Sequence, residues 1–291
     1  MVNSWRGWVL SVHEKIGIVV AGHGSKIPEA ILQFQAQIAL ICSDNVRGRK
    51  KIRNEIVEYG FLEFQRPGIG EAIDRAIFRG ANTIVVAPAM LTAAHHVKTD
   101  IPNIIWNAQQ RYPLIPIHYA RHLDLHPKIL KLCKHRIRQA GLGIDLNETS
   151  LIVVGRGSSD STGNEDVIKL TLLLRETFHF ADSRRCYTSV AAPLLKDALA
   201  QADQQAYRSG RQLRSTLIFP YLLFHGVLLE KMQEVTRAFQ EDHPDHFVKL
   251  ALPLGPDPLV ADALRDRCNA TILLANQEKT YNHEKNGKKT A

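Results

Sequence analysis

Four side chains that can bind a metal ion or move a proton follow expected strands in the first half of the chain. They are His23, Glu63, His95 and His96. Imidazole and carboxylate groups suit first-row divalent ions such as Co²⁺ and Fe²⁺, and an unperturbed imidazole, with a pKa of about 6.5, also accepts a proton near neutral pH. Taken singly, each residue is a weak signal, because a histidine after a strand is more often a hydrogen-bonded structural residue.

An internal duplication supplies a control for these residues. The similar segments are IGIVVAGHGS (16–25) with SLIVVGRGSS (150–159), and TIVVAPAML (83–91) with TLIFPYLLF (216–224). The offset is 133 residues from His23 to Arg156 and 132 from Pro88 to Pro220. An offset this constant in separated segments indicates a duplicated domain.

The second copy has lost the candidate ligands while keeping the strands and glycines around them. Arg156 stands at the position of His23, Ser189 and Val190 stand near that of Glu63, and Leu228 stands at that of His96. If these residues served only the fold, the two copies would be expected to treat them alike. The difference favours a functional site in the first half.

Other histidines fit a structural role better. His122, His126 and His135 could form a further metal cluster, but the duplicate of His126 is Asp257, an ordinary helix N-cap. His126 is therefore predicted to cap a helix. His225 aligns with Ala93 and not with His96, so it is not counted as a ligand.

The elements that must position these residues alternate between strand and helix. The strands are expected at Gly17–Ala21, Ile56–Phe61, Thr83–Ala87, Ile115–Tyr119, Leu151–Val154, Tyr187–Ala191, Ser215–Phe219 and Val248–Leu252, with helices between them. Such alternation predicts an α/β fold of two tandem repeats, each a small, mostly parallel sheet flanked by helices. Ligands of such sheets bind beyond the carboxyl ends of the strands.

The repeats are expected to span residues 16–141, which carry the metal site, and residues 150–274, which lack its ligands. A polar stretch at 142–149 would join them, and the polar, lysine-containing stretch 275–291 is expected to be disordered.

Composition narrows the function. The chain has 291 residues, 45% of them hydrophobic, and a formal net charge of +8. No apolar run approaches the roughly 20 residues of a membrane-spanning helix, and the first residues make a poor signal peptide, so a cytoplasmic protein is expected. A basic chain without aromatic–basic interleaving favours an acidic small molecule over nucleic acid. Four separated cysteines argue against a zinc ribbon or an iron–sulfur cluster.

Three motifs in the first half, AGHGS (21–25), VEYGFLEFQRPGI (57–69) and GANTIVVAPAMLTAAHHVKTDIP (80–102), resemble the sirohydrochlorin chelatases, the class II chelatase family. In the second half, VVGRGSSDSTGNEDV (153–167), IFPYLLFHGVLLEKM (218–232) and PLGPDPLV (253–260) are similar to the second repeat of its long, duplicated form. The resemblance runs from about Ile16 to Cys268.

The resemblance implies a lyase-type enzyme that inserts Co²⁺ or Fe²⁺ into sirohydrochlorin, in cobalamin or siroheme biosynthesis. By that resemblance, His23 accepts protons and binds metal with His96, and Glu63 is a looser match to an acidic catalytic position. The loop Leu91, Thr92, Ala93, Ala94, His95 would embrace the tetrapyrrole. His95 departs from the glycine expected there. The family further implies a monomer whose two halves mimic a dimer.

The substrate that the resemblance implies is a polyanion, so Arg156 and Lys98 are candidate anchors for its carboxylates. Alternatively, Arg156 caps a local carbonyl or pairs with Asp160. We expect no cofactor beyond the divalent metal, no nucleic acid and no membrane partner. The main rival function is a metal-binding or metal-delivery protein that transforms nothing. GHGSK and GRGSS lack the spacing of a phosphate-binding loop, and no GxSxG motif indicates a hydrolase.

Overall fold

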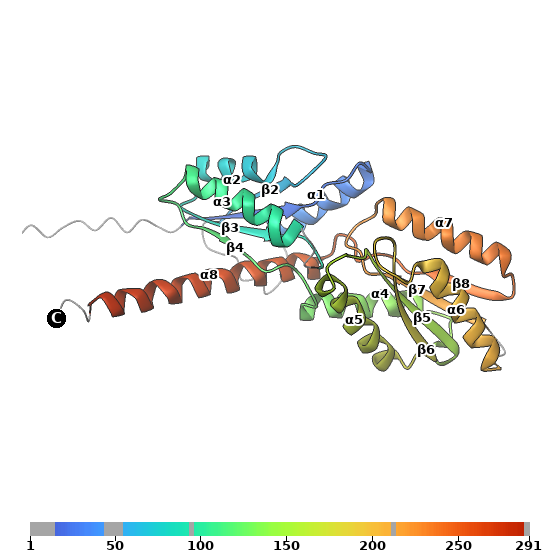
Figure 1. The fold of residues 1–291 in the computed structure, drawn as a ribbon. Helices are drawn as coiled ribbons and strands as arrows, with labels where there is room; N and C mark the ends of the chain where they lie inside the picture. The colour runs from blue at the N-terminus through green and yellow to red at the C-terminus, as the bar shows by residue number, and fades with distance from the viewer. Residues whose placement is uncertain (1–14, 44–54, 93–95, 211–213, 288–291) are drawn as a thin grey trace, which may run out of the picture.

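A computed structural model describes residues 15–43, 55–92, 96–210 and 214–287. It contains two four-stranded parallel sheets, each covered by helices (Figure 1). The strand orders are β2-β1-β3-β4 and β6-β5-β7-β8, so the same topology occurs twice. The predicted pair of parallel α/β repeats is confirmed.

The elements of the first half are β1 (Ile16–Gly22), α1 (Pro28–Cys42), β2 (Ile56–Phe61), α2 (Ile69–Phe78), β3 (Thr83–Pro88), the π-helical turn η1 (His96–Asp100), α3 (Ile101–Arg111), β4 (Ile117–Tyr119) and α4 (Pro127–Ala140). Those of the second half are the 3₁₀ turn η2 (Leu146–Glu148), β5 (Thr149–Gly155), α5 (Thr162–Phe178), β6 (Asp182–Tyr187), α6 (Leu195–Arg208), β7 (Arg214–Pro220), α7 (Val227–Asp242), β8 (His246–Leu250) and α8 (Pro258–Gly287).

The inner strands lead into the loops that contain the candidate site residues. β1 and β5 are buried along their whole length, as expected of apolar strands between two neighbours and two helical layers. β1 pairs with β2 and β3 on its two sides, which brings the loops that follow these three strands to one edge of the sheet. β5 pairs in the same way with β6 and β7.

The predicted position of one strand is wrong. A strand was expected at Tyr187–Ala191, but β6 spans Asp182–Tyr187 and ends where the expected strand begins. β6 has the sequence DSRRCY and lies at the edge of its sheet. An edge strand can be polar because one of its sides is not paired, so its sequence lacks the apolar run that marks the inner strands.

The two halves exchange their last helices. α8 of the second half packs against α1, β3 and β4 of the first half, and Figure 1 shows it running along the first sheet. Arg136 of α4 in turn donates to the carbonyls of Pro253 (3.0 Å) and Leu254 (2.6 Å) in the second half. One hydrophobic cluster therefore contains buried residues of both halves, and the repeats of the sequence are not separate packing units.

The expected disorder at 275–291 is wrong for residues 275–287, which continue α8 to Gly287. This stretch contains no proline and no internal glycine before Gly287. It extends a helix already anchored on the first half, so it needs no apolar stripe of its own to nucleate. Among the described residues, no helix has the length and apolar character to cross a membrane.

Candidate functional site

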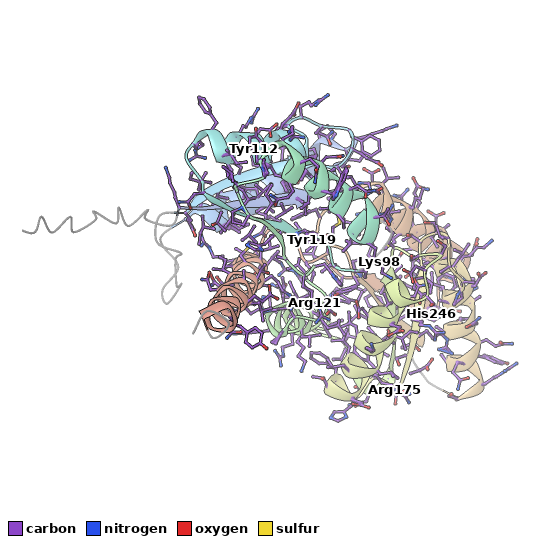
Figure 2. The ribbon with its side chains drawn as sticks, turned by 60° about the vertical axis from the view of Figure 1, so that its left-hand side comes forward. Lys98, Tyr112, Tyr119, Arg121, Arg175 and His246 are labelled. Carbon is purple, nitrogen blue, oxygen red and sulfur yellow. The ribbon has the colours of Figure 1, made fainter. Side chains whose placement is uncertain are left out.

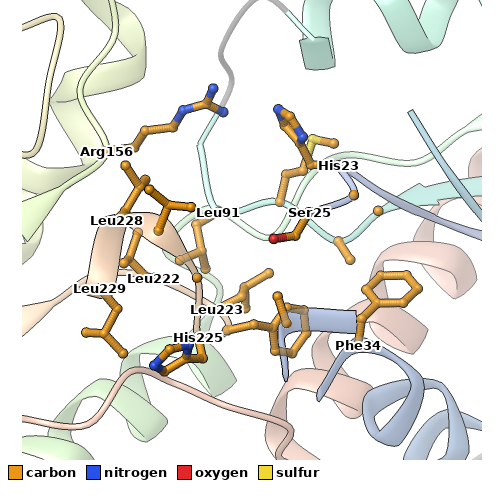
Figure 3. A pocket seen from close by; sticks show the side chains of 18 of the residues that line it. His23, Ser25, Phe34, Leu91, Arg156, Leu222, Leu223, His225, Leu228 and Leu229 are labelled. Carbon is orange, nitrogen blue, oxygen red and sulfur yellow. The ribbon is translucent and has the colours of Figure 1, made fainter. Parts of the chain in front are cut away.

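A cavity of about 450 Å³ lies between the two halves. Its walls come from the loops that follow β1, β2 and β3 in the first half and β5 and β7 in the second, together with parts of α1 and α5. The carboxyl ends of both sheets therefore face one shared space, as expected for ligand sites of parallel sheets. Figure 3 shows His23 and Arg156 along one side of this cavity and His225 on the other.

His23 lines the cavity directly after β1 and is half-buried. The next residue, Gly24, has a φ of +93°, and a Cβ there would lie 1.9 Å from the carbonyl oxygen of Glu63. Only glycine fits so close an approach. The Glu63 N–H donates to the carbonyl of His23 (3.0 Å), so the loops after β1 and β2 are joined at the histidine.

The Gln65 side chain fixes the same loop. Its amide oxygen accepts from the Ser25 N–H (2.9 Å) and its amide nitrogen donates to the Ser25 carbonyl (2.5 Å). In the second half, Asn164 makes the same pair of bonds to Ser158, at 3.0 and 2.8 Å. Both loops are thus braced by an amide side chain, although the two amides come from different elements.

Glu63 does not line the cavity, and its side chain is exposed. The neighbouring Phe64 lines it instead and stacks against His23, with ring centroids 6.4 Å apart and an interplanar angle of 18°. The Lys26 ammonium lies 5.3 Å from the centre of the Phe64 ring, within the range of a cation–π contact. Sequence analysis missed Phe64, because nothing in its residue type signals a role.

The expected substrate loop is only partly described. Leu91 and Thr92 line the cavity, whereas Ala93, Ala94 and His95 lie outside the described residues. The backbone of His96 opens η1, but its side chain also lies outside the description. Tyr119 of β4 donates to the Val97 carbonyl (2.9 Å) and so ties η1 to the sheet (Figure 2).

Arg156 lines the same cavity from the second half, in the place that His23 has in the first. It is exposed and follows β5 directly. Gly157 repeats the close approach of Gly24, since a Cβ there would lie 2.0 Å from the Ser189 carbonyl oxygen. Asp160, which was the alternative partner expected for Arg156, pairs with Lys98 of η1. Lys98 therefore bridges the two halves beside the cavity.

His225 is a cavity residue that sequence analysis set aside. It aligns with Ala93 and follows β7, and it lines the cavity together with Leu222, Leu223 and Leu229 (Figure 3). Its backbone N–H donates to the side-chain oxygen of Gln33 in α1 (2.8 Å). Alignment of the two copies does not point to His225 as a ligand, because the first copy has an alanine, Ala93, at the equivalent position.

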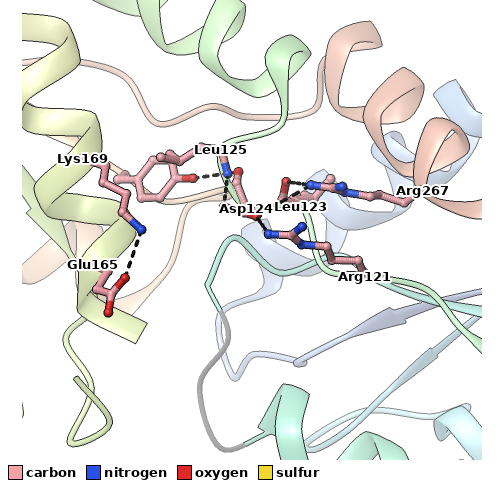
Figure 4. A network of polar contacts seen from close by, with 8 residues as sticks. Arg121, Leu123, Asp124, Leu125, Glu165, Lys169 and Arg267 are labelled. Atoms are coloured by element: carbon pink, nitrogen blue, oxygen red, sulfur yellow. Dashed lines mark hydrogen bonds and ion pairs between the residues drawn. The ribbon is translucent and has the colours of Figure 1, made fainter. Parts of the chain in front are cut away.

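A polar network at the seam between the halves is centred on Asp124 (Figure 4). Ligand atoms of His122, Asp124 and Asp166 lie within 4.8 Å of one another. Asp124 pairs with Arg121 and lies 3.9 Å from the Arg267 guanidinium. Both guanidinium groups lie against Asp124, and the cluster is better described as an ion-pair network than as a metal centre.

His126, the next histidine along the chain, is a helix cap as predicted. Its Nδ1 accepts from the Lys128 N–H at the start of α4 (3.3 Å).

Comparison with known proteins agrees with the repeat. The CbiX family model matches the chain twice, over residues 17–140 and 150–271. A sirohydrochlorin cobaltochelatase of Priestia megaterium is 30% identical over 258 residues, covering 88% of this chain and 79% of that protein. A sirohydrochlorin ferrochelatase of Bacillus subtilis (strain 168) is 28% identical over 270 residues, covering 93% and 96%.

Solved structures give the same result. The sirohydrochlorin chelatase SirB from Bacillus subtilis subspecies spizizenii, in complex with cobalt, has a TM-score of 0.71 and 27% identity, covering 88% of this chain and 95% of that one. SirB from Bacillus subtilis with Fe³⁺ has a TM-score of 0.74, 27% identity and the same coverage. The resemblance found in the sequence is confirmed, and the chain belongs to the CbiX family.

Proposed function

We propose that this chain inserts a divalent metal ion, Co²⁺ or Fe²⁺, into sirohydrochlorin. The observation that carries the proposal is the cavity between the halves, to which the first half contributes His23 and the second half contributes Arg156 at the equivalent position. Relatives that match most of the chain's length are a sirohydrochlorin cobaltochelatase and a sirohydrochlorin ferrochelatase. The metal is a substrate in this reaction, and no resident cofactor is part of the proposal.

The reaction requires a base beside the macrocycle. Two pyrrole N–H bonds must break as one M²⁺ enters, and each nitrogen keeps its electron pair to bind the metal. In our proposal His23 holds the incoming ion together with His96 and accepts a proton. A positioned base of this kind contributes roughly 10²- to 10⁴-fold to the rate. Phe64 limits the orientations of the His23 ring, since the two rings stack.

The cavity offers both apolar and cationic contacts to such a substrate. Leu91 of the first half and Leu222 and Leu223 of the second line it, and these suit the faces of a conjugated ring. Arg156 would bind a peripheral carboxylate, for which its planar fork is suited. We further propose that Thr92, Ala93, Ala94 and His95 contact the ring.

Glu63 takes a less direct part in this proposal. Its side chain is exposed and outside the cavity wall, so it would act on protons after they leave His23. A monomeric, cytoplasmic enzyme with two pseudo-dimeric halves completes the proposal.

The test is the absorbance of sirohydrochlorin on addition of Co²⁺ or Fe²⁺, with and without protein. The proposal predicts that the protein accelerates the spectral change over the spontaneous rate, and that the preferred metal is the one accelerated more. A metal-binding or delivery protein would bind Co²⁺ in a titration without accelerating the change, and that result would contradict the proposal.

A further inference from the structure

The cavity has a second imidazole on the wall opposite to His23. His225 lies in the loop between β7 and α7, and its backbone N–H is bonded to Gln33 of the other half. The position of this loop is therefore fixed across the seam. Figure 3 shows the ring across the cavity from His23, beside Leu223 and Leu229.

The ring of His225 makes no hydrogen bond to any residue that the structure describes. Its Nδ1 is shielded from solvent and has no partner there. Buried polar atoms are normally hydrogen-bonded, and an exception calls for an explanation. Since Nδ1 is the shielded nitrogen, Nε2 is the one left to reach a bound molecule. The ring lines the cavity, so Nε2 is the nitrogen through which it can contact a bound macrocycle.

Few other groups of the cavity wall could accept a proton. Lys26 and Arg156 are cations, and an arginine does not lose its proton in proteins. The Tyr221 hydroxyl donates to the Asp124 carbonyl (3.1 Å), and burial raises its pKa well above the usual range. Within the described part of the wall, the two imidazoles are the groups suited to take protons, and the proposed reaction releases two.

We propose that His225 accepts one of the two pyrrole protons, from the side of the macrocycle opposite to His23. This inference rests on the proposed function. The N–H bond breaks with its electron pair remaining on the pyrrole nitrogen, where the pair then binds M²⁺. The proton passes to Nε2 of His225, and the imidazolium later releases it to water. His225 is thus a catalytic residue supplied by the half that lacks the metal ligands.

The test compares His225→Gln and His225→Ala with the wild type under saturating Co²⁺. Glutamine keeps the polarity and approximate length but cannot accept the proton, while alanine opens space for free imidazole. We expect kcat for insertion to fall about 10- to 100-fold in both, within the usual range for a positioned base. The KM for sirohydrochlorin and the Co²⁺ affinity should stay within about twofold. Added imidazole should restore kcat in His225→Ala but not in His225→Gln, each relative to wild type in the same imidazole.

The matched control is His135→Gln, since His135 is an exposed histidine of α4 away from the cavity. It should leave kcat unchanged. Thermal unfolding of each variant checks the fold, and His225→Gln keeps the test decisive if the alanine variant does not fold.

Three outcomes would overturn the assignment: an unchanged kcat, a rise in KM alone, or a lowered kcat in His225→Ala that imidazole does not rescue. A wild type that does not accelerate insertion would overturn the proposed function as well, whereas an active wild type with fully active His225 variants would overturn this inference alone.

Discussion

Phe64 and Val190 occupy equivalent positions of the two repeats and share a left-handed backbone conformation, with φ of 65° and 68°. Each lies within a tight turn, closed by hydrogen bonds from Gln65 to Glu63 (2.8 Å) and from Ala191 to Ser189 (2.7 Å). This conformation is uncommon for a residue with a side chain and especially for a branched one. The turn is therefore a feature of both repeats, whereas only the first half places a phenyl ring against a histidine, His23.

We predict that Phe64→Ala lowers kcat/KM for metal insertion about two- to tenfold, while Val190→Ala leaves it unchanged. Aromatic pairs contribute about 0.5–1.5 kcal/mol beyond the area that they bury, and Phe64 contacts His23 and lines the cavity. Both side chains are exposed, at 55% and 73%, so neither change should lower the thermal unfolding midpoint much. Equal losses in the two variants would mean that the turn, and not the ring, matters.

We predict that His23→Ala abolishes insertion and leaves the fold intact. His23 lies in a loop at the cavity wall, outside the hydrophobic clusters, and its proposed role as base is worth roughly 10²- to 10⁴-fold. The initial rate of the absorbance change measures the first effect and circular dichroism the second. Retention of more than about a tenth of the rate would refute the role of His23 as base.

Local patterns in the sequence predict much of this fold, for identifiable reasons. β2 spans Ile56–Phe61 as predicted, and α2 (Ile69–Phe78) is one of the helices expected between the strands, because these segments have clear apolar patterns. The packing of α8 on the first half is not predictable in this way, since it depends on contacts between residues far apart in the chain. β6 is misplaced because an edge strand needs no apolar run.

The residues of the candidate site also fall into those that the sequence predicts and those that it does not. The constant offset between the copies places His23 and Arg156 at equivalent positions, and both line the cavity. Phe64 and His225 escape sequence reasoning because their roles depend on a left-handed turn and on the approach of two loops across the seam. The metal role of His96 stays a prediction, as its side chain is outside the described residues.

We predict that Arg156→Ala raises the KM for sirohydrochlorin and leaves the Co²⁺ affinity unchanged. Its guanidinium faces the cavity (Figure 3). Loss of one charge-assisted contact costs on the order of 1.5–3 kcal/mol, which corresponds to an increase in KM of about 10- to 150-fold. Arg156→Lys should recover part of the loss, because the ammonium keeps the charge but not the bidentate geometry. Steady-state kinetics with a parallel Co²⁺ titration checks both, and a loss of metal affinity would count against a substrate contact.

We predict that Arg265→Ala destabilises the fold by about 3–5 kcal/mol, the usual effect of leaving a buried charge without its partner. Arg265 of α8 makes two bonds to Glu55 of the other half, at 2.8 and 2.6 Å, and the two side chains are 7% and 3% exposed. Denaturant unfolding measures the loss.

Two further variants test this explanation. Arg265→Met combined with Glu55→Leu should regain most of the lost stability, because no unpaired charge remains. Lys169→Ala, which breaks an exposed pair with Glu165, should cost less than about 1 kcal/mol. A double variant as unstable as the single one would show that packing, and not charge, holds α8 in place.

The last prediction concerns the pH dependence of stability at the seam. Burial, and then the neighbouring Asp124 carboxylate, raise the pKa of Asp166 from 3.8 to about 6. Between these pH values the folded protein binds more protons at this position than the unfolded chain does, so this carboxyl lowers the free energy of unfolding as pH rises from about 4 to about 6. Asp166→Asn should remove that loss.

We therefore expect the stability of Asp166→Asn, relative to wild type, to increase from pH 4 to pH 6 and then to stay level up to pH 7. Denaturant unfolding at each pH measures the difference, which cancels the titration of the groups that both proteins share. Glu165→Gln is the matched control, because Glu165 is the preceding residue of α5 and its side chain is 53% exposed; its difference from wild type should show no such rise. A difference for Asp166→Asn that is independent of pH would show that this carboxyl is already ionised at pH 4, and that the arginines around Asp124 compensate for its burial.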